Sequence, residues 1–158
     1  GFLFNRVLSG PEYLILDPEF AVPPAQKDMD VAVYFGAGTP DEFIAGVDEQ
    51  LNRAGLYRAR GDIGWPTTLR RAKFFVGSVG MAMYDAIAAR AAPILVSRDD
   101  DHKMSAEKIG LEAPLLDETS PEALVARITW DKWRTPCVID GMGVWRVAKA
   151  VEEVLCRR

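Results

Sequence analysis

The sequence is poor in the residues that build metal and redox centres. Its 158 residues include two cysteines and one histidine. Cys137 and Cys156 lie far apart and match neither a metal-ligand spacing nor a Cys-x-x-Cys motif. Sites made of cysteine and histidine are therefore not expected. We predict a reduced, cytoplasmic protein with incidental thiols and with no resident metal or cofactor.

The chain also lacks long apolar runs and any excess of basic residues. Its longest apolar stretches are a handful of residues, far short of the ~20 that span a bilayer, and its first residues do not form a signal-peptide pattern. Lys and Arg number 19 against 23 Asp and Glu, a net charge of −4, whereas nucleic-acid binders usually carry a basic face. Neither a membrane span nor a nucleic-acid partner is expected. The hydrophobic content of 49% fits one globular domain.

Short apolar runs alternate with helical patterns along the chain. Residues 30–35 read as a strand. Thr39 is then predicted to cap a helix, with Pro40 at its first position and Glu42 completing a capping box. The remaining predicted elements are strands at 73–76, 93–96 and 115–116, and helices at 81–90, 103–109, 121–130 and 144–155.

This order predicts an α/β fold, a Rossmann-like three-layer parallel sheet with helices on both faces. The strands are continuously apolar, as buried parallel strands are. In such sheets ligands bind beyond the carboxyl ends of the strands, near a switch in strand order. The glycine turns at 36–38 and 77–80 are therefore the candidate site.

The two turns differ in how well they suit a phosphate. The turn with Gly36 and Gly38 lacks the third glycine of a dinucleotide fingerprint, so it is either a weak phosphate site or a tight turn that needs positive φ. The turn from Ser78 to Gly80 would direct free N–H groups of the next helix outward, and its serine adds a hydroxyl donor. Asp85, one helical turn further on, is either a ribose ligand or a solvated helix residue.

Two other polar or aromatic groups have ordinary explanations. The run Asp99–Asp101 with His102 would suit a hard cation, but consecutive loop residues rarely converge on one ion, and a solvated acidic loop is favoured. The four tryptophans include candidates for a base-stacking platform, although core or interface packing is the better interpretation. They are Trp65, Trp130, Trp133 and Trp145.

Four segments in order resemble one enzyme family. Residues 8–20, 36–41, 76–85 and 139–147 are similar to the C-terminal domain of the UDP-sugar hydrolases of pseudaminic acid biosynthesis, which have the two-domain GT-B fold. The last segment matches the family's closing Asp-Gly-x-Gly-x-x-Arg motif. The resemblance divides the chain into a domain-opening segment, residues 1–20, and a single nucleotide-sugar-binding domain, residues 21–158.

The resemblance implies a nucleotide site without a catalytic residue. The family's catalytic histidine lies in an N-terminal domain, which is the missing partner of this chain. Asp85 takes the place of a ribose-binding glutamate, and the backbone near Ile63 would meet uracil. The diphosphate would face Ser78, Val79, Gly80 and Met81.

Three departures from the family pattern bear on that site. Met81 replaces a residue that usually carries a hydroxyl, Asp85 is one methylene shorter than glutamate, and Asp100–His102 adds negative charge beside a diphosphate. Two hypotheses follow. The chain is the UDP-sugar-binding half of a hydrolase or glycosyltransferase of surface polysaccharide biosynthesis, or it is a non-catalytic interaction module that has lost nucleotide binding and forms a homodimer.

Overall fold

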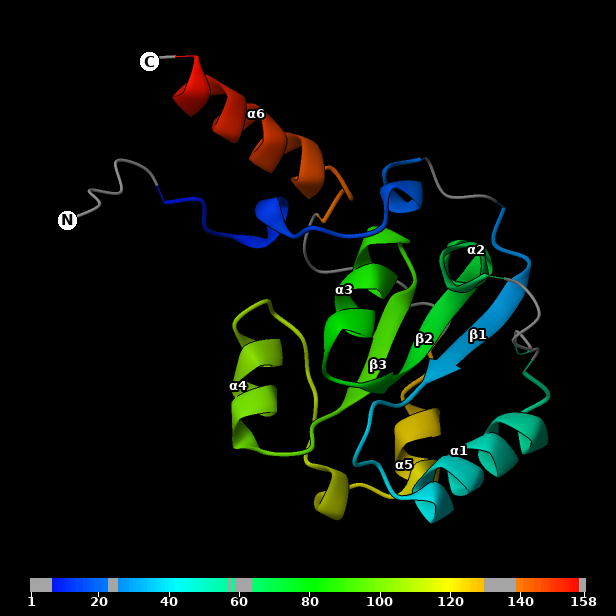
Figure 1. Ribbon diagram of the computed structural model, residues 1–158. Helices are drawn as coiled ribbons and strands as arrows, with labels where there is room; N and C mark the ends of the chain where they lie inside the picture. Colours follow the sequence, from blue (N-terminus) through cyan, green and yellow to red (C-terminus); the bar gives the residue numbers. More distant parts are fainter. Residues whose placement is uncertain (1–6, 23–25, 57, 59–63, 130–138, 157–158) are drawn as a thin grey trace.

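The computed structural model describes residues 7–22, 26–56, 58, 64–129 and 139–156. Three parallel strands form a sheet in the order β1-β2-β3, shown in Figure 1. The predicted parallel α/β fold is confirmed, and the strands predicted at 30–35, 73–76 and 93–96 lie at their expected places. The strands are β1 (Met29–Tyr34), β2 (Ala72–Ser78) and β3 (Ala92–Val96).

Helices cover both faces of this sheet. Side chains along a strand alternate between the faces, so Phe74 and Val76 of β2 join one buried cluster and Phe75 joins the other. The first cluster lies against α1 (Asp41–Arg53) and α5 (Pro121–Ala126). The second lies against α2 (Trp65–Arg71), α3 (Met81–Ala88) and α4 (Asp100–Glu107). The sheet is the middle of three layers.

Two isolated bridges extend the strand order on either side. Val31 of β1 pairs in parallel with Arg58, and Ser97 pairs in parallel with Leu115. After β1 the chain therefore passes through α1 to the outer edge of β1 and then returns to form β2 on the other side. The direction of winding reverses between β1 and β2. In doubly wound sheets this switch point is where ligands bind, at the carboxyl ends of the strands.

Two predicted helix starts are wrong in detail. Helix α1 begins at Asp41 with Pro40 as its N-cap, and the N–H of Thr39 instead donates to the carbonyl oxygen of Gly36 at 3.4 Å, closing a turn. Helix α4 begins at Asp100, ahead of the expected 103, because the carboxylate of Asp99 accepts the N–H of His102 at 2.9 Å. The predicted acidic loop is thus the cap and first turn of a helix, where carboxylates are favourable.

Other boundaries follow from local hydrogen bonds. Ser120 caps α5 by accepting the N–H of Ala123 at 3.1 Å, and α5 ends at Ala126, before the predicted end at 130. The predicted strand at 115–116 is a single bridge followed by the 3₁₀ helix η3 (Leu116–Glu118). Helix α2 was not predicted.

The last helix, α6 (Gly143–Leu155), is fastened to the amino-terminal segment, which carries the 3₁₀ helices η1 (Pro11–Tyr13) and η2 (Pro18–Ala21). Arg146 makes a two-pronged ion pair with Asp140, at 2.7 and 2.5 Å, and also donates to the carbonyl oxygen of Glu12 at 3.0 Å. Side chains on Gly141 or Gly143 would collide with backbone atoms of residues 13–21. The closing Asp-Gly-x-Gly-x-x-Arg motif therefore acts here as a structural clasp.

No helix in the described part of the chain is both long enough and apolar enough to cross a membrane.

Candidate functional site

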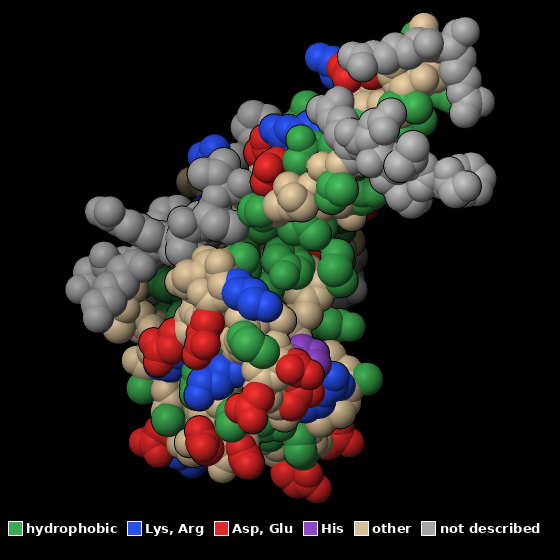
Figure 2. Space-filling view, turned by 90° about the vertical axis from the view of Figure 1, so that its left-hand side faces the viewer, with side chains coloured by type: hydrophobic (Ala, Val, Ile, Leu, Met, Phe, Trp, Pro, Cys, Tyr) green, Lys and Arg blue, Asp and Glu red, His purple; other side chains and the backbone are tan. Residues whose placement is uncertain are grey.

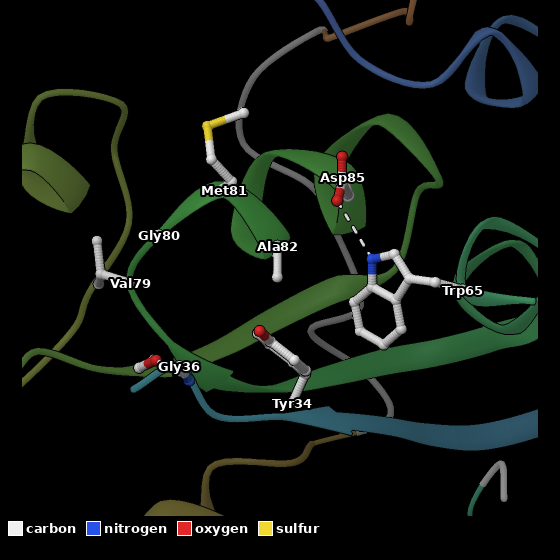
Figure 3. A pocket seen from close by; sticks show the side chains of 9 residues that line it. Tyr34, Gly36, Trp65, Val79, Gly80, Met81, Ala82 and Asp85 are labelled. Atoms are coloured by element: carbon white, nitrogen blue, oxygen red, sulfur yellow. Dashed lines mark hydrogen bonds between the residues drawn. The ribbon is translucent and has the colours of Figure 1, made fainter. Parts of the chain in front are cut away.

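A cavity of about 490 Å³ opens at the carboxyl ends of β1 and β2, at the point where the winding reverses. Figure 3 shows its walls, which come from β1, β2, α2 and the first turns of α3. The lining residues are Tyr34, Gly36, Trp65, Ser78, Val79, Gly80, Met81, Ala82 and Asp85.

Ser78 ties the two glycine turns together. It is the last residue of β2, and its Oγ accepts the N–H of Gly36 at 2.9 Å. A serine hydroxyl that accepts one hydrogen bond keeps its own proton free to donate. The close pairing of β1 and β2 positions this contact, because a side chain on Gly77 would collide with the carbonyl oxygen of Tyr34. The hydroxyl of Ser78 is thus fixed at the cavity wall.

The amino-terminal end of α3 opens onto the cavity. Gly80 is its N-cap, with an extended backbone (φ 164°, ψ −165°) and no side-chain capping bond. The N–H groups of Met81 and Ala82 have no acceptor within the helix, and the helix dipole adds a partial positive charge at this end. A Cβ on Gly80 would meet no heavy atom of the described chain within 4 Å. Neither backbone strain nor packing requires glycine here, and its bare backbone leaves the helix end accessible.

Asp85 and two aromatic rings form the opposite wall. The indole Nε1 of Trp65 donates to Oδ2 of Asp85 at 3.2 Å, as Figure 3 shows. The ring of Trp65 lies 5.4 Å from that of Tyr34 and 6.1 Å from that of Phe75. Burial raises the pKa of the Asp85 carboxyl, the bond from Trp65 opposes this, and repulsion from Asp17 adds to it. One carboxylate is therefore held beside an aromatic surface.

Six of the residues predicted from sequence meet in this one cavity. They are Gly36, Ser78, Val79, Gly80, Met81 and Asp85. Gly38 is not in the lining: it has a positive φ of 92° and faces the side chain of Arg98. Ile63 lies outside the described residues, so its predicted contact stays a prediction.

Tyr34, Trp65 and Ala82 also line the cavity and were not predicted to be site residues. The position of Tyr34 near the end of a predicted strand could have identified it, because the carboxyl ends of parallel strands share one edge of the sheet. Trp65 combines two roles considered for the tryptophans: it packs on Phe75 in the core and exposes one face to the cavity. Trp130 and Trp133 lie outside the described residues.

A second polar cluster lies beside the first glycine turn. Arg98 donates to the carbonyl oxygen of Ala37 at 3.1 Å, and Nδ1 of His102 lies 2.5 Å from Oδ1 of Asp99. Hydrogen bonds from the backbone and side chain of His102 lower the pKa of Asp99. Within the described ranges, no three His, Cys, Asp or Glu side chains are gathered as metal ligands. This cluster is therefore the start of α4, and its polar side chains bond to one another and to nearby backbone groups.

Comparison of the chain with protein-family models, with curated proteins and with solved structures gives no match in any of the three. The structure itself shows a small Rossmann-like parallel α/β domain with a cavity at the switch point of its sheet.

Proposed function

We propose that this cavity binds the nucleotide of UDP or a related nucleotide-sugar, and that the chain is the nucleotide-binding half of a GT-B-type hydrolase or glycosyltransferase of surface polysaccharide biosynthesis. One observation carries the proposal: residues chosen from sequence for diphosphate and ribose contacts line a single cavity at the switch point of the sheet.

The cavity offers a complementary group to each part of such a ligand. The diphosphate lies at the start of α3, where it accepts hydrogen bonds from the N–H groups of Met81 and Ala82 and from the hydroxyl of Ser78. Asp85 is four residues beyond Met81, about 6 Å along the helix axis. Its carboxylate accepts hydrogen bonds from the ribose hydroxyls. The ring of Trp65 supplies an apolar face for the ribose or the base.

The charge of the cavity sets the expected affinity. The described residues that line the cavity include no Lys or Arg, and Asp85 is the single acidic residue among them. The phosphates therefore depend on backbone N–H groups and on a helix end, whose interaction with an anion contributes roughly 0.3–2 kcal/mol. We expect modest affinity, and binding without turnover, because the resemblance puts the catalytic histidine in a separate domain.

A thermal-shift series with uridine, UMP, UDP and UDP-N-acetylglucosamine tests the proposal. A ligand at 100 times its Kd stabilises the folded state by about 2.7 kcal/mol, which raises Tm by roughly 5–10 °C in a chain of this size. UDP is expected to raise Tm more than uridine at equal concentration, because uridine lacks the groups that the start of α3 binds. The absence of a shift with every nucleotide at millimolar concentration would refute the proposal.

A matched pair of variants locates the site. Gly80 and Gly64 are both helix N-caps without a side-chain capping bond, and a Cβ on either meets no described heavy atom within 4 Å. Gly80→Val places its side chain at the cavity, whereas Gly64 is not in the lining. Gly80→Val should abolish the UDP-dependent rise in Tm while Gly64→Val keeps it. Equal responses of the two variants would show that UDP binds elsewhere.

The alternative function is a non-catalytic interaction module. The exposed apolar residues of α6, among them Val151 and Leu155, favour it. A chain with no response to nucleotides and a stable self-association would support this alternative over nucleotide binding.

A further inference from the structure

Tyr34 is the residue at which β1 leaves the core and enters the cavity. Residues two apart on a strand face the same side of the sheet, and Ala32, which faces the helices α2 and α3, is fully buried. Tyr34 shares that side, but it is 52% exposed and lines the cavity. The last side chain of β1 is therefore turned towards the space that a ligand would occupy.

The ring of Tyr34 is held by a contact with Trp65. The two ring centroids lie 5.4 Å apart, with the ring planes tilted by 52°. Trp65 is itself positioned by the ring of Phe75, at 6.1 Å, and by its hydrogen bond to Asp85. A tyrosine has only two side-chain torsions to fix, so it presents a polar group at low cost in conformational entropy. The ring contact thus orients the Tyr34 hydroxyl before a ligand arrives.

The hydroxyl of Tyr34 points into the cavity. Figure 3 shows it directed towards Gly36 and Ala82, at the end of the cavity where α3 begins. Within the described part of the chain this hydroxyl makes no hydrogen bond. Packing against Trp65 requires the ring alone, so a phenylalanine would serve the fold equally well. The hydroxyl is therefore available to donate a hydrogen bond to a ligand.

Charged groups beside the cavity are already paired or mixed in sign. Arg98, next to the turn at 36–38, donates to the carbonyl oxygen of Ala37 at 3.1 Å, and its Nε lies 3.6 Å from the carboxylate of Asp99. On the face of the molecule that carries α4, Figure 2 shows acidic and basic side chains intermixed in the lower part. Neutral donors inside the cavity therefore gain importance for binding a phosphate.

We propose that Tyr34 is a ligand-binding residue whose hydroxyl donates a hydrogen bond to the α-phosphate of the bound nucleotide. This inference rests on the proposed function, in which the diphosphate lies at the start of α3 and the ribose lies beside Asp85. The α-phosphate joins these two parts. The Tyr34 hydroxyl faces the first turn of α3 while its ring adjoins Trp65, so it lies between them. Tyr34 and Ser78 then bind the diphosphate from the strand ends, and α3 binds it from the other side.

Calorimetric titration with UDP tests the contact in wild type, Tyr34→Phe and Tyr84→Phe. Tyr84 is half-buried on α3 and is not in the cavity lining, so its variant is a matched loss of one hydroxyl. Tyr34→Phe should lower the affinity for UDP about tenfold, and Tyr84→Phe should leave it unchanged. The Tm of unliganded Tyr34→Phe should equal that of the wild type, because the ring contact with Trp65 remains.

Two results would overturn the inference in different ways. Equal affinities of the wild type and Tyr34→Phe would refute the role of the hydroxyl and leave nucleotide binding intact. Absence of UDP binding to the wild type would refute the proposed function and this inference together.

Phosphorus NMR of UDP saturated with protein identifies the phosphate that accepts the bond. The α and β resonances are separate, and loss of a hydrogen bond alters the shift of the phosphate that accepted it. Between wild type and Tyr34→Phe the α resonance of bound UDP should differ, and the β resonance should not. A difference confined to the β resonance, or no difference in either, would contradict the assignment to the α-phosphate.

Discussion

At the scale of single residues, Asp85 is the position where stability and the proposed function conflict. Burial raises the pKa of its carboxyl, so the charged form destabilises the folded state. The bond from Trp65 offsets part of this cost. Carboxyls in such environments are concentrated at functional sites, because a half-buried charge is retained there for the ligand it binds.

The variant Asp85→Asn should therefore separate the two effects. An amide oxygen can still accept the hydrogen bond from Trp65 and carries no charge, so we expect the free energy of unfolding at pH 7 to rise by roughly 0.5–1 kcal/mol. Affinity for UDP should fall about tenfold, corresponding to a ribose hydrogen bond worth about 1.4 kcal/mol. Urea denaturation and calorimetric titration measure the two quantities. Loss of stability, or unchanged affinity, would contradict the assigned role.

The raised pKa of Asp85 also determines whether stability rises or falls with pH. A raised pKa means that the folded state binds the Asp85 proton more tightly than the unfolded chain does. Stability then falls as the pH rises from the ordinary value of 3.8 through the raised pKa. Urea denaturation at a series of pH values from 3.8 upwards should show this fall in the free energy of unfolding of the wild type, relative to that of Asp85→Asn. A difference between the two proteins that does not vary with pH would be inconsistent with a raised pKa.

Lys27 gives a second pH signature at the other end of the molecule. Its Nζ donates to the carbonyl oxygens of Leu69 and Ala89, at 3.3 and 2.7 Å. Burial, with repulsion from Arg90 and Arg70, lowers its pKa from 10.5 to about 8. The unfolded chain holds this proton more tightly, so stability should rise with pH between about 8 and 10.5. The free energy of unfolding of Lys27→Met, measured by urea denaturation, should not show that rise. The same dependence on pH in the wild type and in Lys27→Met would contradict the lowered pKa.

At the scale of elements, the sequence predicts strands and amphipathic helices well and helix starts less well. The three strands are short apolar runs bounded by turns, a local signal. Helix α2 has the sequence WPTTLRR, too short to show a period, and forms because Thr68 and Leu69 are buried against neighbouring elements. Asp99 could have been recognised from sequence as a helix cap, because two acidic residues follow it. Thr39 matched a capping pattern, but it lies in a turn with Gly36 and does not cap the helix.

The motif of residues 140–146 fastens the start of α6 to the amino-terminal segment. A Cβ on Gly143 would collide with the carbonyl oxygen of Leu14. Gly143→Ala should therefore loosen α6 from η1 and cost about 1–3 kcal/mol. Hydrogen exchange should show lost protection in α6. Gly64→Ala, at a position without steric conflict, should leave that protection unchanged, and protection that persists in Gly143→Ala would disprove the clasp.

At the scale of the whole molecule, topology explains why part of the site was predictable and part was not. The glycine turns follow β1 and β2 directly, and parallel strands place their carboxyl ends on one edge, so Ser78 and Gly36 were expected together. Trp65 and Asp85 come from different helices that meet only because α2 and α3 share a face. No local pattern links them. The reversal between β1 and β2 rests on a bridge at Arg58, which carries no strand signal of its own.

The proposed nucleotide site consists of the start of α3 and Asp85. An NMR titration of the isotope-labelled chain with UDP tests it most directly, by following the backbone amides of Gly80, Met81 and Ala82 and the indole N–H of Trp65. We expect saturable shifts of these resonances in the wild type and in Gly64→Val, and none in Gly80→Val. Resonances that stay unmoved at millimolar UDP, or that shift only elsewhere in the chain, would contradict it.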